Sequence, residues 1–298
     1  MCAARSGRLT TMRIAFLGTG RMGTELALHL LQTHDLTVWN RTEANAQRVL
    51  TAGAQWAHTP QAAVKNADAV VTALFGPDTV RDIVIDTQLI PQGTPWLDAT
   101  TVSPHDAEEF AATCDTYIAT PVIGTLGPAR AGKLGVYVGT PHAELRDLAL
   151  DIARPWADPQ RLIGVDSASR AATGKLLANL ALAISAQGLR EALALGDALG
   201  VGEEDVLTML QSTGLQFIAN MKAPFIRGER DTAQGDFTVD AIAKDVRLMI
   251  AEMDAAAHRS DQHAGADLRA LRAALASLES QQSAGRGNHD FSAMLSSE

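Results

Sequence analysis

The stretch MRIAFLGTGRMGTELALHLLQTHDLTVWNRT, residues 12–42, is the most informative part of the chain. Its first apolar run is followed at once by three glycines with the spacing G-x-G-x-x-G, and then by an amphipathic segment. In this context the first glycine permits a tight turn, the second lets the backbone approach a pyrophosphate, and the third allows close packing of helix on strand. The order of strand, glycine turn and helix therefore predicts a dinucleotide site. The residues of this predicted turn are Gly18, Thr19, Gly20, Arg21, Met22 and Gly23.

The second apolar segment of this stretch ends in Asn40, Arg41 and Thr42. A site for NAD usually has an acidic residue at this point, about 20 residues after the glycines, which binds the ribose hydroxyls. Here Arg41 can instead pair with a 2′-phosphate, to which Asn40 and Thr42 can donate hydrogen bonds. In the alternative interpretation, Asn40 and Thr42 cap the next helix and Arg41 is solvated. The pattern favours NADP(H) over NAD(H).

Composition excludes several classes of protein. The chain has 298 residues and a formal net charge of −9, and its lysines and arginines are scattered, which argues against nucleic-acid binding. No apolar run approaches the roughly 18 residues of a membrane span. The histidines lack the spacing of metal ligands, so no metal site is predicted. Residues 1–11 are interpreted as a disordered leader or as the product of a start upstream of Met12. The two cysteines are compatible with a reducing, cytoplasmic location.

The chain changes character near residue 165. Before it, strand and helix patterns alternate, which predicts an α/β fold with a doubly wound, mainly parallel Rossmann sheet. After it, one long helical pattern without proline runs over residues 169–199, and only helical patterns follow. We therefore expect an NADP-binding Rossmann domain at residues 12–165. The long helix should join it to an all-helical substrate and dimerisation domain at residues 166–298.

Lys175 and Asn179 form a second constellation. They are four residues apart in the long helical pattern and therefore lie on one face. A lysine at this point could act as general acid toward a carbonyl oxygen, with Asn179 orienting the lysine or the substrate. The plainer alternative is an exposed lysine followed by a polar packing residue.

From Met12 to Met294 the chain resembles the β-hydroxyacid dehydrogenase family, which includes 3-hydroxyisobutyrate dehydrogenase-like proteins and is related to 6-phosphogluconate dehydrogenase. Six ordered segments carry the resemblance. They are FLGTGRMG with the later NRT, LDATTVSP at 97–104, TPVIGTLGPARAGKL at 120–134, Lys175 with Asn179, Lys244-Asp245 in FTVDAIAKDVRL, and GNHDFSAM at 287–294.

The resemblance implies hydride transfer between C4 of a nicotinamide and a carbon of a small substrate. Lys175 would donate the proton in reduction and remove it in oxidation. Lys244 would contact the cofactor from the helical domain. The resemblance also implies a homodimer or a dimer of dimers. It assigns Leu74, Phe75 and Thr101 to the cofactor site, and Val122, Ile123, Gly124, Thr125 and Arg170 to the substrate site.

Two segments of the chain depart from the family pattern. Ile123 replaces a serine that helps to hold a substrate carboxylate, and Thr125 replaces the second glycine of that loop. Ser169 and Ala171 replace the glycines that usually precede the lysine, and Arg170 between them could bind an anion or be solvated. The main hypothesis is an NADP(H)-dependent oxidoreductase acting on a hydroxy or oxo compound such as a 3-hydroxyacid. The alternatives are an imine reductase, which Ile123-Gly124 resembles, and a non-catalytic NADP-binding oligomeric module.

Overall fold

The computed structural model describes residues 11–259 and 267–295, so the predicted leader lies almost wholly outside the described residues. The chain forms two compact units, Met1–Lys175 and Leu176–Glu298, which are described separately. The units divide within the long helix α8 (Ala168–Ala198). The predicted domain boundary after residue 165, which assigns the whole helix to the second domain, stays a prediction.

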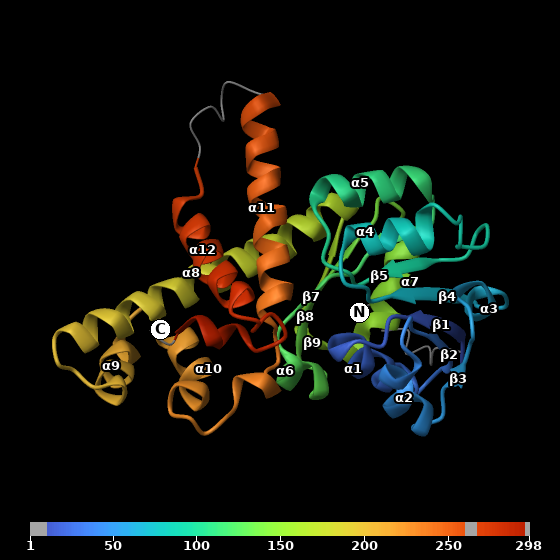
Figure 1. Cartoon of the computed structure of the whole chain (residues 1–298). Coiled ribbons are helices and arrows are strands. Elements are labelled where there is room, and N and C mark those ends of the chain that lie inside the picture. The colour runs from blue at the N-terminus through green and yellow to red at the C-terminus, as the bar shows by residue number, and fades with distance from the viewer. Residues whose placement is uncertain (1–10, 260–266, 296–298) are drawn as a thin grey trace, which may run out of the picture. The chain divides into compact units, whose positions relative to one another are not determined.

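The first unit is built on a nine-stranded sheet with the order β3-β2-β1-β4-β5-β6-β8-β7, in which β9 also pairs with β8 (Figure 1). Strands β3 to β6 along this order are mutually parallel, whereas β8 runs antiparallel to β6 and to β7 and parallel to β9. The order 3-2-1-4-5-6 is that of the Rossmann fold, which confirms the predicted fold class. The strands are β1 (Arg13–Leu17), β2 (Asp35–Trp39), β3 (Gln55–Trp56), β4 (Ala69–Thr72), β5 (Trp96–Asp98), β6 (Tyr117–Ala119), β7 (Val122–Ile123), β8 (Leu134–Gly139) and β9 (Ala157–Val165).

Helices cover both faces of this sheet because its central strands are apolar on both sides. One face packs on α1, α2, α6 and α7, and the other on α3, α4, η2, α5 and the beginning of α8. These elements are α1 (Arg21–Leu30), η1 (Glu43–Ala46), α2 (Gln47–Thr51), α3 (Pro60–Val64), α4 (Pro77–Val80), the π-helical turn η2 (Arg81–Ile85), α5 (Pro104–Thr113), α6 (Leu126–Arg130), α7 (Ala143–Ala153) and η3 (Arg154–Trp156).

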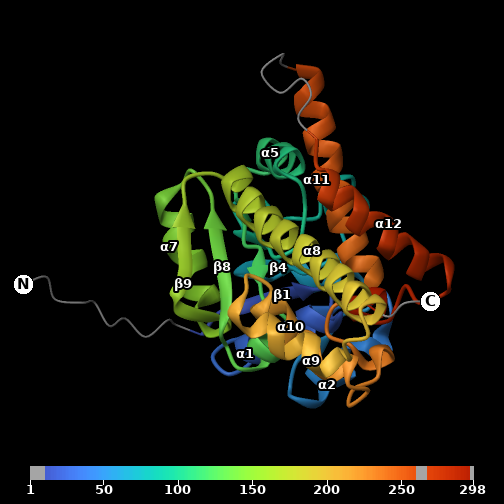
Figure 2. The ribbon, with the colours of Figure 1, turned by 90° about the vertical axis from the view of Figure 1, so that its left-hand side faces the viewer.

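The second unit is helical, as predicted. Its core lies between the second part of α8 and the helices that follow, and α11 and α12 lie side by side (Figure 2). The elements after α8 are α9 (Glu203–Met209), η4 (Leu210–Ser212), α10 (Gln216–Ile226), η5 (Thr232–Gln234), α11 (Val239–Arg259), α12 (Arg269–Ser283) and η7 (Phe291–Leu295). Among the described residues, no helix combines the length and apolar character that a membrane span needs.

Two glycines of α8 allow neighbouring side chains to pack closely against the helix. A Cβ on Gly174 would lie 2.6 Å from the ring of Tyr137, and one on Gly196 would lie 2.3 Å from Cγ2 of Val206. Each glycine therefore admits a neighbouring side chain against the helix backbone, within the first unit at Gly174 and within the second at Gly196.

Candidate active site

The glycine turn between β1 and α1 depends on its glycines. Gly18 has a φ of +101°, which L-residues rarely adopt, and a Cβ there would lie 2.4 Å from the carbonyl oxygen of Ala73. A Cβ on Gly23 would lie 2.0 Å from the carbonyl oxygen of Gly18. By contrast, a Cβ on Gly20 would meet no atom within 4 Å. The turn therefore packs tightly against strand and helix while its middle glycine faces open space.

Asn40 ties the end of β2 to this turn. Its Oδ1 accepts a hydrogen bond of 3.0 Å from the Thr19 N–H, and its Nδ2 donates one of 2.8 Å to the carbonyl oxygen of Thr42. Thr42 occupies the N-cap position of η1 but accepts no hydrogen bond through its side chain. The amide of Asn40 thus serves the loop geometry and does not cap the next helix. Arg41 is exposed and forms no ion pair with any described residue.

The loops after β4 and β5 meet at the same edge of the sheet. The Leu74 N–H donates to Thr100 Oγ1 at 3.0 Å, and the Thr100 N–H donates to Asp98 Oδ1 at 3.0 Å. Phe75 is 58% exposed, and Thr101 is half-buried. Because the carboxyl ends of parallel strands share one edge, these loops and the glycine turn border the crevice in which open α/β sheets bind ligands.

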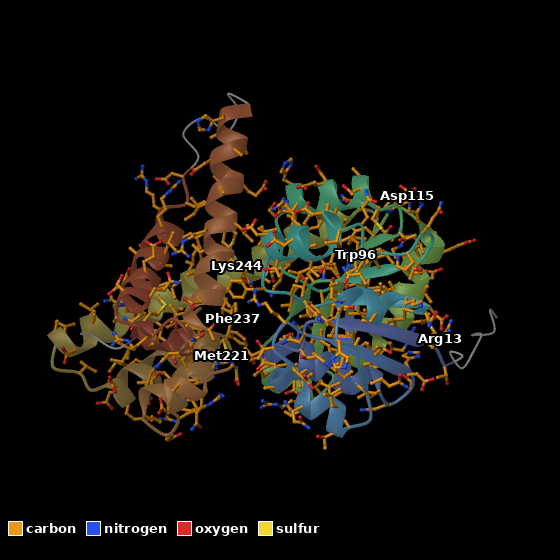
Figure 3. All side chains as sticks on the ribbon, turned by 45° about the vertical axis from the view of Figure 1, so that its right-hand side comes forward. Arg13, Trp96, Asp115, Met221, Phe237 and Lys244 are labelled. Carbon is orange, nitrogen blue, oxygen red and sulfur yellow. The ribbon has the colours of Figure 1, made fainter. Side chains whose placement is uncertain are left out.

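Asp98 is a buried carboxyl beneath these loops. It accepts hydrogen bonds from Thr72 Oγ1 at 2.7 Å and from the Tyr117 hydroxyl at 3.3 Å, and Trp96 Nε1 donates to the same threonine oxygen at 2.9 Å. Burial raises the pKa of Asp98 to about 6, although its hydrogen bonds act in the opposite direction. Trp96 marks the position of this network in the sheet (Figure 3).

The predicted substrate loop folds into β7, a turn and α6. Val122 is buried, and Ile123 is paired with Gly135 of β8. Gly124 has a φ of +139°, and Thr125 stands at the N-cap position of α6. The sequence did not predict this short strand and helix, because runs of two and five residues are too short to show periodicity.

Two contacts tie α6 to α1, and sequence reasoning missed both. His29 of α1 forms a hydrogen bond of 2.7 Å with the carbonyl oxygen of Ala129. Glu25 is buried in α1 and accepts from Arg130 Nε at 3.3 Å and from Arg48 Nη1 at 2.8 Å. The helix that follows the glycine turn therefore also anchors the loop that carries Ile123.

Lys175 lies in the first part of α8 and is the last residue of the first unit. Lys175 is only 8% exposed, so the alternative of an exposed lysine is wrong. Arg170 is exposed and forms an ion pair of 2.7 Å with Asp166, which is also exposed. The charge of Arg170 is thus shared with a neighbouring carboxylate.

In the second unit, Asp245 brings two predicted site residues together. Asn179 Nδ2 donates to Asp245 Oδ2 at 2.5 Å, and Lys244 Nζ lies 2.6 Å from Asp245 Oδ1. Figure 3 shows Lys244 on α11. A carboxylate can only accept, so the NH₂ group of Asn179 faces Asp245 and its Oδ1 is directed elsewhere as an acceptor. Asp245 is buried. The sequence indicates it only as part of the Lys244-Asp245 motif, because its contact with Asn179 joins helices that are far apart in the sequence.

The glycine turn fits the pyrophosphate of a dinucleotide. Gly20 faces open space where a side chain would obstruct a pyrophosphate, and the first N–H groups of α1 follow directly. The hydroxyl of Thr19 is buried without a hydrogen-bond partner among the described residues. The N–H groups at the start of α1, the close contacts of Gly18 and Gly23, and the strand order are together typical of a dinucleotide-binding site.

Two family models match the chain. The model described as the NAD binding domain of 6-phosphogluconate dehydrogenase matches residues 13–153. The model described as NAD-binding of NADP-dependent 3-hydroxyisobutyrate dehydrogenase matches residues 170–297. The two matches therefore cover both units of the chain.

Individual relatives agree with the models. The 3-hydroxyisobutyrate dehydrogenase of Pseudomonas aeruginosa is 30% identical over 300 residues, which cover 94% of this chain and 96% of that protein. The uncharacterized oxidoreductase YfjR of Bacillus subtilis is 28% identical over 297 residues, which cover 95% and 99%.

Solved structures share the fold. The 3-hydroxyisobutyrate dehydrogenase of Mycobacterium tuberculosis, solved with L-serine, has a TM-score of 0.79 at 22% identity and covers 96% of this chain and 98% of its own. An imine reductase of Myxococcus stipitatus, solved with NADP⁺, has a TM-score of 0.62 at 20% identity, with coverage of 95% and 98%. At these identities the structures show the fold alone. Through its family models and its relatives, the chain belongs to the β-hydroxyacid dehydrogenase family and is a nicotinamide-dependent dehydrogenase or reductase.

Proposed function

We propose that the protein is an NADPH-dependent reductase, and in the reverse direction a dehydrogenase, of small oxo and hydroxy compounds, with Lys175 as general acid and base. The observation that carries the proposal is the burial of Lys175, which is 8% exposed and follows the contact of Gly174 with the Tyr137 ring. Lysines are mostly exposed in folded proteins, and buried ionisable side chains are concentrated at functional sites.

The preference for NADPH rests on Arg41. A guanidinium can bind a phosphate through two parallel hydrogen bonds, and Arg41 stands directly after β2 with its charge unpaired by described residues. Asn40 holds the same loop against the glycine turn through Thr19. The 2′-phosphate of NADPH is therefore the anion for which Arg41 is best placed.

The bound nicotinamide would supply or accept the hydride. Lys175 Nζ would donate a proton to the substrate oxygen in reduction and remove it in oxidation. Asn179 is four residues further along the same helix and would offer its Oδ1 as an acceptor, because Asp245 holds its NH₂ group. Its Oδ1 is thus suited to a hydroxyl or an ammonium group and not to a carboxylate. Lys244 shares the carboxylate of Asp245 and would contact the cofactor.

The substrate class follows from the family and from the loop. Relatives include 3-hydroxyisobutyrate dehydrogenases and a glyoxylate/succinic semialdehyde reductase of Arabidopsis thaliana, which is 24% identical. Ile123 offers an apolar side chain where a serine hydroxyl is usual in the family. We therefore infer a small aldehyde, ketone or hydroxy acid as substrate, with an apolar group near Ile123.

The experiment compares wild type with Lys175→Ala on a panel of aldehydes, 2- and 3-oxo acids and cyclic imines, followed by NADPH absorbance. We expect Lys175→Ala to lower kcat for carbonyl reduction about 10²- to 10⁴-fold, the range for loss of a positioned general acid. NADPH binding, measured by fluorescence, should be unchanged. Lys65→Ala, on an exposed lysine, is the matched control.

The other outcomes separate the alternatives. Full carbonyl-reducing activity in Lys175→Ala would exclude the role of Lys175. Turnover of imines alone would favour the imine-reductase alternative, to which Ile123-Gly124 and the shared fold of imine reductases point. NADPH binding without any turnover in the wild type would favour a non-catalytic module.

A further inference from the structure

An arginine that the sequence did not single out lies against the substrate loop. Arg161 belongs to β9, and its guanidinium lies over Gly135 of β8. A Cβ on Gly135 would lie 3.0 Å from Arg161 Nη2 and 3.3 Å from Cβ of Ile123. The missing side chain at Gly135 therefore makes room for the guanidinium next to the position that has lost the family serine.

Strand directions place Arg161 at the edge of the sheet that carries the cofactor loops. β8 runs antiparallel to β6, so its first residues lie at the edge where β6 ends. β7 pairs with these first residues through Ile123 and Gly135, and β9 runs parallel to β8. The neighbouring strands β8 and β9 can be followed in Figure 2.

The alternation of side chains along β8 shows on which face of the sheet Arg161 lies. Gly135, Tyr137 and Gly139 are two residues apart and so point to the same side of the sheet. The start of α8 packs on this side, because a Cβ on Gly139 would lie 2.7 Å from Cβ of Ala171 and one on Gly174 would meet Tyr137. Arg161 therefore lies on the face along which α8 leads to Lys175.

The charge of Arg161 is available to a ligand. Arg161 is exposed and forms no ion pair or hydrogen bond with another described side chain. Arg170, the other arginine near this helix start, is paired with Asp166. Guanidinium groups bind carboxylates through two parallel, charge-assisted hydrogen bonds.

We propose that Arg161, seated over Gly135 beside Ile123, is the binding site for the carboxylate of the substrate, an inference that rests on the proposed reductase function. An acidic substrate would then be held by the guanidinium in place of the family serine, while Ile123 packs against its carbon chain. The substrate class narrows to oxo and hydroxy acids.

The test uses 4-oxobutanoate and its methyl ester, which differ only in the charge, with NADPH. We expect Arg161→Ala to raise KM for 4-oxobutanoate about 10- to 100-fold, the effect of losing a charge-assisted hydrogen bond, with kcat largely kept. KM for the ester should not change. Gly135→Ala should also raise KM for 4-oxobutanoate, because the added methyl group would displace the guanidinium of Arg161. Arg146→Ala is the matched control, because Arg146 packs over Gly164 of the same strand on the opposite face.

Equal changes for acid and ester, or no change for either, would overturn the assignment while leaving the reductase function intact. If the wild type reduces no carbonyl compound, the proposed function fails, and the carboxylate site is then tested without turnover. Succinate would be titrated by calorimetry into the NADPH-loaded protein. Binding that is lost in Arg161→Ala supports the site, and absent binding or equal binding in both proteins overturns it.

Discussion

At the scale of single residues, Asn40 and Arg41 have different roles at the end of β2. Asn40 uses its amide to hold Thr19 and the loop, whereas the exposed guanidinium of Arg41 has no described ion-pair partner. The first residue thus gives the cofactor loop its geometry, and the second gives it a charge.

Arg41→Ala should raise KM for NADPH by about 10-fold or more while leaving KM for NADH nearly unchanged, since only NADPH carries the 2′-phosphate. Initial rates with both cofactors on one substrate measure the effect. Arg48→Ala provides a comparison, because Arg48 is already engaged by Glu25 in the first unit. Equal changes for both cofactors would exclude a phosphate contact by Arg41.

Residues differ in how readily the sequence reveals them. Gly18 and Gly23 were predictable, because their roles depend on neighbours within one strand, turn and helix. Asp245 and Arg161 were not, because the partners that define them come from other elements: Asn179 lies 66 residues before Asp245, and Gly135 adjoins Arg161 only through strand pairing.

At the scale of elements, strand β4 ends earlier than its apolar pattern predicts. The run from Ala69 to Phe75 suggests one strand, but the strand stops at Thr72. The N–H of Leu74 bonds to the hydroxyl of Thr100 and not to a neighbouring strand. The hydroxyl of Thr100 thus replaces the strand-to-strand hydrogen bond at Leu74, and the strand ends before it. The apolar pattern of the sequence cannot predict such a side-chain acceptor.

Three strands share the buried carboxyl of Asp98, which makes their packing sensitive to pH. The pKa of Asp98 is raised from 3.8 to about 6 by burial, so the folded state holds a proton that the unfolded state releases between these values. The contribution of Asp98 to the free energy of unfolding therefore falls as the pH rises from about 4 to about 6, and stays low above it.

Asp98→Asn should remove this dependence. The free energy of unfolding of wild type relative to Asp98→Asn should fall by about 3 kcal/mol between pH 4 and pH 7, as about two pKa units correspond to that amount. Urea unfolding followed by tryptophan fluorescence reports on this unit, because all four tryptophans lie in residues 1–175. Asp68→Asn is the comparison: its pKa is lowered to about 2 by the Arg13 guanidinium, so its contribution should be flat over this range. If the difference in the free energy of unfolding between wild type and Asp98→Asn does not change with pH, the raised pKa of Asp98 is contradicted.

At the scale of the whole molecule, the two units are stabilised by different means. The first has apolar layers on both faces of a sheet. The second adds to its helical core a buried ion pair of 2.6 Å between Lys222 of α10 and Asp290. The ammonium also lies 3.7 Å from the ring centroid of Phe291. Burial by itself would raise the pKa of Asp290, but the Lys222 ammonium and the Ser292 N–H hold it below its usual value.

This pair joins the last described segment of the chain to the middle of the helical unit. Asp290 also accepts from the N–H groups of Asp236 and Phe237, so one carboxylate holds three segments. Removing one member leaves the other charge buried without compensation, which costs about 3–5 kcal/mol. Lys222→Met and Asp290→Asn should each lower the free energy of unfolding of the helical unit by about that amount.

Far-UV circular dichroism during urea unfolding, with hydrogen exchange of peptides from residues 216–226 and 287–295, measures the loss. The double variant should cost less than the sum of the two single variants, because it leaves no uncompensated charge. Glu204→Gln, which breaks the exposed pair with Arg227, should change little and serves as the control. Additive losses in the double variant would show that Lys222 and Asp290 act independently, and the C-terminal segment would then be held chiefly by its apolar contacts through Phe291, Met294 and Leu295.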